Sequence, residues 1–266
     1  MDCLLTNSSN PGSNQMSHLI PPFKEIRESE LDTLSETFDV VQPKFDGIFA
    51  HFVVKNGQGE VFSKTGKSKA VLDTQMPDGI YIGEYIRYSA WSATKSFYGK
   101  VVIFDAIEIE GESLESLSLL RRYGLISYVP GDTGALKLQL YQRHRADELW
   151  NKLVATHQYE GLVFKKGVDL LGQPWVKCKL QLEETFYITE LYEGNGRNAG
   201  KLGAFGIART PGGKEVARVG SGINLQQAAE FWSLGRALVD QPIEVKSYLG
   251  FGGEAPRQPV FLRLKL

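Results

Sequence analysis

Short runs of β-branched and aromatic residues recur along this chain from Val40 onward, and Gly, Asp and Asn residues separate them. Such runs predict β-strands, because these side chains fit a pleated, half-buried surface. In the first part of the chain the predicted strands are residues 40–42, 47–54, 61–63, 79–88, 100–107, 162–166 and 175–180. Two helices are expected between them, one that starts after Ser113 and stops at Gly124, and one over residues 146–157. The pattern favours a β-rich protein of the α+β class.

The pattern of strands changes after Glu183. Short predicted strands recur there, separated by Gly-rich turns, at residues 186–192, 203–209, 215–219, 243–248 and 260–264. One helix is expected over residues 224–238, with Asn224 as its N-cap. Five strands and a helix within about 80 residues are typical of a small Greek-key barrel of the OB type. We therefore expect two domains, residues 1–182 and 183–266, with residues 1–17 as a polar, flexible tail.

The charge of the whole chain predicts no polyanionic partner. Thirty basic residues face 31 acidic ones, which gives a net charge of −1. The balance is uneven, however, because the net charge is −5 over residues 1–43, +3 over residues 44–182 and +1 over residues 183–266. A nucleic acid would therefore meet local patches of the second and third segments.

Several sequence features point to the cytosol. No run approaches the roughly 18 apolar residues that cross a bilayer, so no membrane association is expected. The N-terminus lacks the basic start and apolar stretch of a signal peptide. Cys3 and Cys178 are too few for a disulfide framework and suit a reducing compartment.

Lys44-Phe45-Asp46-Gly47 is the first segment that carries chemistry. A lysine amine becomes a nucleophile when burial or neighbouring cations lower its pKa. Asp46 lies two residues further on, on the same face of an extended chain, where it can orient the amine or relay a proton. The alternative is a solvated lysine before an Asp-Gly turn.

Three other predicted strands carry charged or aromatic residues in unusual places. Lys177 and Lys179 share one side of a strand, where they repel each other unless an anion such as phosphate lies between them; otherwise the strand is an edge with solvated lysines. Glu84 interrupts a very apolar run, so it requires a cation, either Lys, Arg or a metal. Phe104 is either a core residue or a surface on which a cofactor stacks.

These segments occur in one order that resembles a known group. They are KFDG at 44–47, SKTG at 63–66, IGE at 82–84, IFD at 103–105, EGLVFK at 160–165 and WVKCK at 175–179. Together they resemble the covalent nucleotidyltransferase superfamily of polynucleotide ligases and capping enzymes. The later segments YEG at 192–194, GKLGAF at 200–205, VGSG at 219–222 and RQPVFLR at 257–263 are similar to the OB domain of ATP-dependent DNA ligases.

The resemblance implies an adenylation domain with mostly antiparallel sheets and packed helices, followed by an OB-fold barrel. It further implies a compact ATP-dependent DNA ligase that seals nicks in duplex DNA as a monomer, in the cytosol of a bacterium or a phage-infected host. Lys44 would attack the α-phosphorus of ATP to form lysyl-AMP, and Asp46 would assist. The implied nucleotide-binding residues are Gln42, Lys44, Glu84, Phe104, Lys165, Lys177 and Lys179. Glu84 and Glu160 would hold Mg²⁺ or Mn²⁺. Lys64, Arg197, Lys201, Arg257 and Arg263 would contact DNA.

The chain departs from the family pattern at four places. Phe49 stands where DNA ligases usually have Arg, Ile82 replaces an acid, and Lys64 replaces Arg. At the C-terminus Lys265 stands for an arginine of the last motif, without the acidic and lysine residues expected after it. Two alternatives therefore stay open: an RNA ligase or capping-type nucleotidyltransferase, and an inactive nucleic-acid-binding relative.

Overall fold

The computed structural model describes residues 19–87, 93–248 and 255–265. Over these residues the chain is mostly β with few helices, and it divides into two compact units, Met1–Lys179 and Leu180–Leu266. The units are divided after Lys179, whereas the sequence places the boundary at residue 182. The predicted flexible tail and Cys3 lie outside the described residues. No helix in the described ranges is long and apolar enough to cross a membrane.

The first sheet of the first unit, called sheet 1 here, has the strand order β1-β12-β11-β2-β10. Its strands are β1 (Phe23–Ile26), β2 (Val40–Lys44), β10 (Tyr141–Gln142), β11 (Gly161–Lys165) and β12 (Trp175–Lys179). β1 runs parallel to β12, and the other pairs are antiparallel. β2 and β11 are buried along most of their length, as their Val, Leu and Phe residues predict.

The second sheet of this unit, called sheet 2, has the strand order β5-β4-β3-β6-β7-β8, and β9 pairs in parallel with β7. Its strands are β3 (Ile48–Lys55), β4 (Gln58–Ser63), β5 (Ser68–Asp73), β6 (Gly79–Tyr85), β7 (Val101–Ile109), β8 (Glu112–Ser113) and β9 (Ala135–Lys137). Asn56 and Gly57 both adopt positive φ angles in the two-residue turn between β3 and β4, as a tight hairpin requires.

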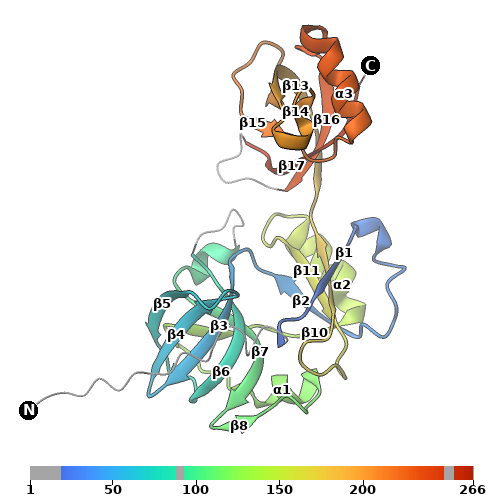
Figure 1. Ribbon diagram of the computed structural model, residues 1–266. Coiled ribbons are helices and arrows are strands. Elements are labelled where there is room, and N and C mark those ends of the chain that lie inside the picture. The colour runs from blue at the N-terminus through green and yellow to red at the C-terminus, as the bar shows by residue number, and fades with distance from the viewer. Residues whose placement is uncertain (1–18, 88–92, 249–254, 266) are drawn as a thin grey trace, which may run out of the picture. The chain divides into compact units, whose positions relative to one another are not determined.

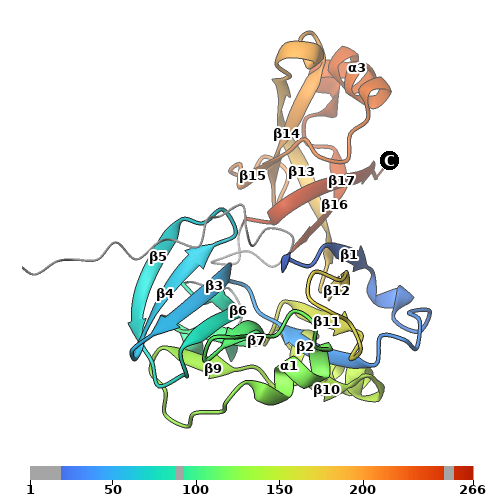
Figure 2. The ribbon, with the colours of Figure 1, turned by 60° about the horizontal axis from the view of Figure 1, so that its bottom comes forward.

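The two faces of sheet 2 have different roles. One face carries Phe52, Tyr81 and Ile103 in a core that also includes residues next to helix α1. The other face carries Phe49, Ile82 and Phe104. Figures 1 and 2 show α1 close to β7, in agreement with its packing on that strand.

The helices of the first unit correct two expectations. Helix α1 is Leu119–Leu125, with Ser118 as its N-cap, so the predicted start after Ser113 is wrong. Ser113 belongs instead to β8, and Gly124 lies inside the helix. Helix α2 (Ala146–Leu149) continues through a wider turn, Trp150–Val154, and therefore ends before the predicted His157. Shorter helical turns are η2 (Glu28–Glu30), η3 (Ala93–Phe97) and η4 (Arg143–Arg145).

The second unit is an antiparallel sheet with the strand order β15-β14-β13-β16-β17. Its elements are β13 (Leu182–Glu193), η6 (Gly196–Asn198), β14 (Leu202–Ala208), β15 (Ala217–Val219), α3 (Leu225–Leu234), η7 (Gly235–Leu238), β16 (Pro242–Tyr248) and β17 (Arg257–Leu264). The predicted N-cap is confirmed, because the Asn224 side chain accepts a hydrogen bond from Gln227 N at 2.9 Å. A bridge between Ser221 and Val260 joins the chain after β15 to β17, so the two edges of the sheet approach each other.

Candidate active site

Strand pairing in sheet 1 brings the charged residues of three distant segments together. Lys44 at the end of β2 is level with Gly161 in β11, and Gly161 is level with Lys179 in β12. A side chain at Gly161 would overlap the carbonyl oxygen of Cys178, so glycine allows the strands to lie this close. Glu160, which precedes β11, is therefore held between the two lysines.

Glu160 binds both lysines with its carboxylate. Its Oε2 accepts a hydrogen bond from Lys44 Nζ at 2.6 Å, and its Oε1 lies 2.6 Å from Lys179 Nζ. The Glu160 side chain is 3% exposed, so these contacts are shielded from water. Burial raises the pKa of Glu160, but the two lysines outweigh burial and hold it below its ordinary value. Glu160 is therefore an ionised bridge between the predicted nucleophile and a predicted phosphate ligand.

The environment of Lys44 corrects one expectation. Burial lowers the pKa of this amine, but Glu160, Glu84 and Asp46 outweigh burial and raise it above its ordinary value. The prediction of a lowered pKa is therefore wrong for this structure, because the neighbours of the amine are carboxylates instead of cations. Lys44 Nζ also donates to the carbonyl oxygen of Phe45 at 3.1 Å.

The lysines of β12 pair with two different carboxylates. Lys177 and Lys179 share one side of the strand, as the alternation predicts. Lys179 binds Glu160, and Lys177 Nζ lies 3.1 Å from Glu25 Oε2.

Glu84 reaches the site from sheet 2. Its Oε1 accepts a hydrogen bond from the backbone N–H of Gly47 at 3.0 Å. A side chain at Gly47 would collide with Tyr85 O and with Glu84 itself, so the glycine of KFDG is needed for this close approach. Burial raises the pKa of Glu84 to about 7; Glu160 and Asp46 add to this, whereas Lys44 and the Gly47 N–H oppose it.

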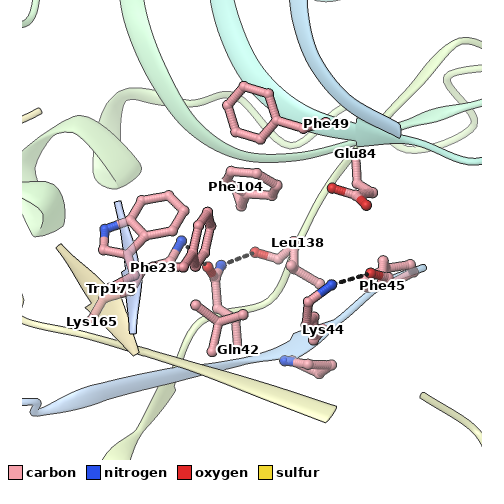
Figure 3. A pocket seen from close by; sticks show the side chains of 12 residues that line it. Phe23, Gln42, Lys44, Phe45, Phe49, Glu84, Phe104, Leu138, Lys165 and Trp175 are labelled. Carbon is pink, nitrogen blue, oxygen red and sulfur yellow. Dashed lines mark hydrogen bonds between the residues drawn. The ribbon is translucent and has the colours of Figure 1, made fainter. Parts of the chain in front are cut away.

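A narrow cavity of about 50 Å³ lies beside these charges, between the two sheets (Figure 3). Five predicted site residues line it: Gln42, Lys44, Glu84, Phe104 and Lys165. Sequence reasoning did not assign its other lining residues to the site; they are Phe23, Pro43, Phe45, Phe49, Leu138, Val163 and Trp175. Figure 3 shows Phe49 and Glu84 projecting from one sheet and Lys44 and Gln42 from the other. The wall is thus mainly apolar, with five aromatic rings and a few polar groups, as is typical of small-molecule sites.

Lys165 is buried in the wall of this cavity and is 1% exposed. Its Nζ donates to Gln42 Oε1 at 2.5 Å and lies 3.7 Å from the centre of the Trp175 ring and 4.7 Å from that of Phe104. Gln42 Nε2 in turn donates to Leu138 O at 3.3 Å. Burial lowers the pKa of Lys165 to about 7, although Asp105 opposes the shift.

We expect Lys165→Met to stabilise the protein near pH 7. An unfolded lysine keeps its proton up to about pH 10.5, whereas the folded one loses it near pH 7, so the unfolded chain binds more protons between these values. The penalty of burying the charge is full below pH 7 and disappears as the pH rises. Urea unfolding at pH 7 should show a gain of about 2–4 kcal/mol that shrinks toward pH 10. The prediction would be contradicted if the difference in the free energy of unfolding between Lys165→Met and wild type stayed constant with pH. It would also be contradicted if the control variant Lys55→Met showed the same difference.

The remaining predicted residues are not among those that line the cavity. Asp46 is 6% exposed and lies next to Lys44. Lys64 is exposed in the turn after β4. Arg197, Lys201, Arg257 and Arg263 belong to the second unit, where the exposed Arg263 pairs with Glu244 at 2.5 Å. Nothing within the described ranges forms a cluster of three or more His, Cys, Asp or Glu residues that could hold a metal.

Two of the family departures are explained by packing. Phe49, in place of the usual Arg, contributes its ring to the cavity wall, 6.3 Å from the ring of Phe104. Ile82, in place of an acid, is fully buried with Leu19 and Ile107. The positions that the family gives to charged side chains are therefore part of an apolar face here.

Phe23 is the site residue that sequence reasoning missed most completely, because β1 was not predicted as a strand. Its four residues pair in parallel with β12, which no local pattern signals. Trp175 was recognised as part of WVKCK but not as a lining residue. Alternation along β12 was the available signal, since it places Trp175 on the side of Lys177 and Lys179.

No protein-family model matches the sequence, and no curated protein matches it. The structure does match solved structures. One, described as DNA binding with a minimal scaffold in Lig E DNA ligases, aligns over 92% of this chain and 99% of its own, with a TM-score of 0.66 and 14% identity. Two forms of a protein named Pmar-Lig cover 92% of this chain and 67% of theirs, with TM-scores of 0.66 and 0.62 and identities of 18% and 16%. The resemblance read from the motifs is thus confirmed at the level of architecture: this chain has the fold of DNA ligases.

Proposed function

We propose that this chain is an ATP-dependent DNA ligase that seals nicks in duplex DNA through a lysyl-AMP intermediate. The proposal rests on the two ion pairs by which Glu160 joins Lys44 to Lys179. Glu84 lies beside them, and a cavity lined by aromatic rings lies next to Lys44. A half-buried amine, a cation for a phosphate and an aromatic pocket for a base are the parts that nucleotidyl transfer requires.

The carboxylates around Lys44 suggest how the amine is prepared. Lys44 is protonated at rest, and its hydrogen bond to Glu160 provides a route for the proton to leave. Lys44 Nζ would then attack the α-phosphorus of ATP, forming a P–N bond as the bond to the β-phosphate breaks and pyrophosphate leaves with the electron pair. Lys179 would stabilise the charge on the phosphate oxygens. Transfer of AMP to a 5′-phosphate and attack by the 3′-hydroxyl, which releases AMP, would complete sealing.

Glu84 and Glu160 suit a divalent cation such as Mg²⁺ or Mn²⁺. Carboxylate oxygens are the ligands these ions prefer, and Mg²⁺ commonly takes one or two of them together with substrate phosphates. Burial raises the pKa of Glu84 to about 7 and the carboxylates of Glu160 and Asp46 add to the shift, so a bound cation would favour the ionised form of Glu84. The ion would neutralise charge on the phosphates of ATP.

We assign the base to the aromatic cavity and the DNA to exposed basic residues. Phe104 would stack on adenine and Gln42 and Lys165 would lie near its edge, which requires the lining rings to move, because the cavity is narrow. The antiparallel second unit is the proposed OB domain, and it would supply Arg197, Lys201, Arg257 and Arg263, with Lys64 from the first unit. We propose that the protein acts as a monomer in the cytosol on nicked duplex DNA.

An RNA ligase or capping-type nucleotidyltransferase is the second candidate. It is favoured by Ile82, since the strand of Glu84 carries a buried aliphatic residue where DNA ligases have a second acid. An inactive nucleic-acid-binding relative would keep the fold without the chemistry.

The test is the mass of the whole protein before and after incubation with ATP and Mg²⁺. We expect a covalent AMP adduct, or an initial mass that already contains it. The adduct should then be consumed by a DNA duplex with a 5′-phosphorylated nick, yielding a sealed strand. Sealing of nicked RNA alone would favour an RNA ligase. A protein that never carries AMP would exclude both kinds of ligase, and an adduct formed from GTP instead would favour a capping-type enzyme.

A further inference from the structure

Strand β1 brings two side chains to the edge of the candidate site. It lies parallel to β12, with Phe23 level with Trp175 and Glu25 level with Lys177. Alternate residues of a strand share a face, so Phe23 and Glu25 lie on the side that faces the cavity. Figure 3 shows the Phe23 ring beside Trp175 in the cavity wall.

Glu25 binds one lysine of the proposed phosphate pair. Its Oε2 lies 3.1 Å from Lys177 Nζ, and the two side chains are 29% and 25% exposed. The same ammonium lies 5.8 Å from the centre of the Phe23 ring. Lys177 is therefore held by two groups of β1, whereas Lys179 binds the carboxylate that also holds Lys44.

We infer that Glu25 competes with the nucleotide phosphate for Lys177, so that β1 sets how strongly the site prefers a phosphorylated nucleoside. This inference rests on the proposed function. A phosphate carries more charge than a carboxylate and displaces it from a partly exposed ammonium, and the exposed Glu25 can turn toward solvent. Each binding event must break the ion pair and place a phosphate near a like charge. Glu25 therefore weakens the binding of phosphates while keeping Lys177 in position between turnovers.

The test compares the binding of AMP with that of adenosine, which differs from AMP only in lacking the phosphate. Glu25→Gln keeps the size of the side chain and the backbone of β1 but removes its charge. By calorimetry, we expect the dissociation constant for AMP to fall about twofold to fivefold, the range that partly exposed ion pairs support. The dissociation constant for adenosine should not change. Glu28→Gln is the matched control, since it removes the same charge from the next, exposed turn and should alter neither constant.

The outcomes separate this inference from the proposed function. If Glu25→Gln binds AMP more weakly than wild type does, Glu25 does not compete with the phosphate for Lys177. The same conclusion follows if Glu25→Gln binds AMP no more tightly than Glu28→Gln does. If both ligands tighten equally, the variant has reshaped the cavity, and the inference fails as well. If wild-type protein binds AMP while Glu25→Gln shows no change, the inference alone is lost. A wild-type protein whose mass shows no covalent AMP and that still binds no AMP would contradict the proposed function itself.

Discussion

Replacing Lys44 with Ala should reduce the covalent AMP adduct by more than about 10³-fold, the scale on which catalysis is lost when a nucleophile is removed. The bond to phosphorus forms at Lys44 Nζ in the proposed reaction, and the neighbouring Lys179 has its ammonium bound to the far oxygen of Glu160. Whole-protein mass spectrometry after incubation with ATP and Mg²⁺ measures the loss directly.

Two further variants make this result specific. Lys44→Arg keeps a positive charge near Glu160 but replaces the amine with a guanidinium that stays protonated, so it should fold and still form no adduct. Lys55→Ala removes an exposed lysine at the end of β3 and should form the adduct as wild type does. Adduct formation in Lys44→Arg would assign the nucleophile to another residue.

Replacing Asp105 with Ala should destabilise the first unit by about 3–5 kcal/mol, because it leaves a buried guanidinium without its counter-ion. Arg122 Nε and Nη2 each donate to the Asp105 carboxylate at 2.8 Å, and their side chains are 1% and 0% exposed. Arg122 Nη1 also donates to the carbonyl oxygens of Leu117 and Asp169, at 2.5 and 3.1 Å. The ion pair thus connects β7, α1 and the loop after β11, next to Phe104 in the sequence.

Urea unfolding of Asp105→Ala measures this cost. Glu148→Ala, which breaks an exposed pairing with Arg145 and Lys152, should cost far less than Asp105→Ala and serves as the control. The double variant Asp105→Leu/Arg122→Met removes both charges and should be more stable than Asp105→Ala. If the double variant is the less stable of the two, the uncompensated charge does not explain the loss.

Local sequence patterns were enough to predict the strands of the site, whereas the family resemblance supplied its residues. Alternation and spacing identified β2, β6, β7, β11 and β12 as strands, and the resemblance carried by the motifs on them implied one site with Gln42, Lys44 and Glu84. Such patterns work because the side chains of a half-buried strand alternate with a fixed period. The same reasoning missed β1, because pairing with a distant strand leaves no local signal, and it missed β5, an edge strand with mostly exposed side chains. It started α1 too early, because Leu114 packs into the core without belonging to the helix.

By itself the sequence determined which chemical groups the site contains: a lysine before Asp-Gly, carboxylates at 84 and 160, an aromatic at 104 and paired lysines at 177 and 179. Only the tertiary structure decided which of them bind each other. Lys44 and Glu160 are 116 positions apart in the chain and come within 2.6 Å because β2 and β11 are neighbours in sheet 1. The sign of the pKa shift at Lys44 depends on this pairing, since the charge of the nearest neighbours outweighs burial. Charge is a property of each residue, but its electrostatic effect depends on distance, and distance is decided by the fold.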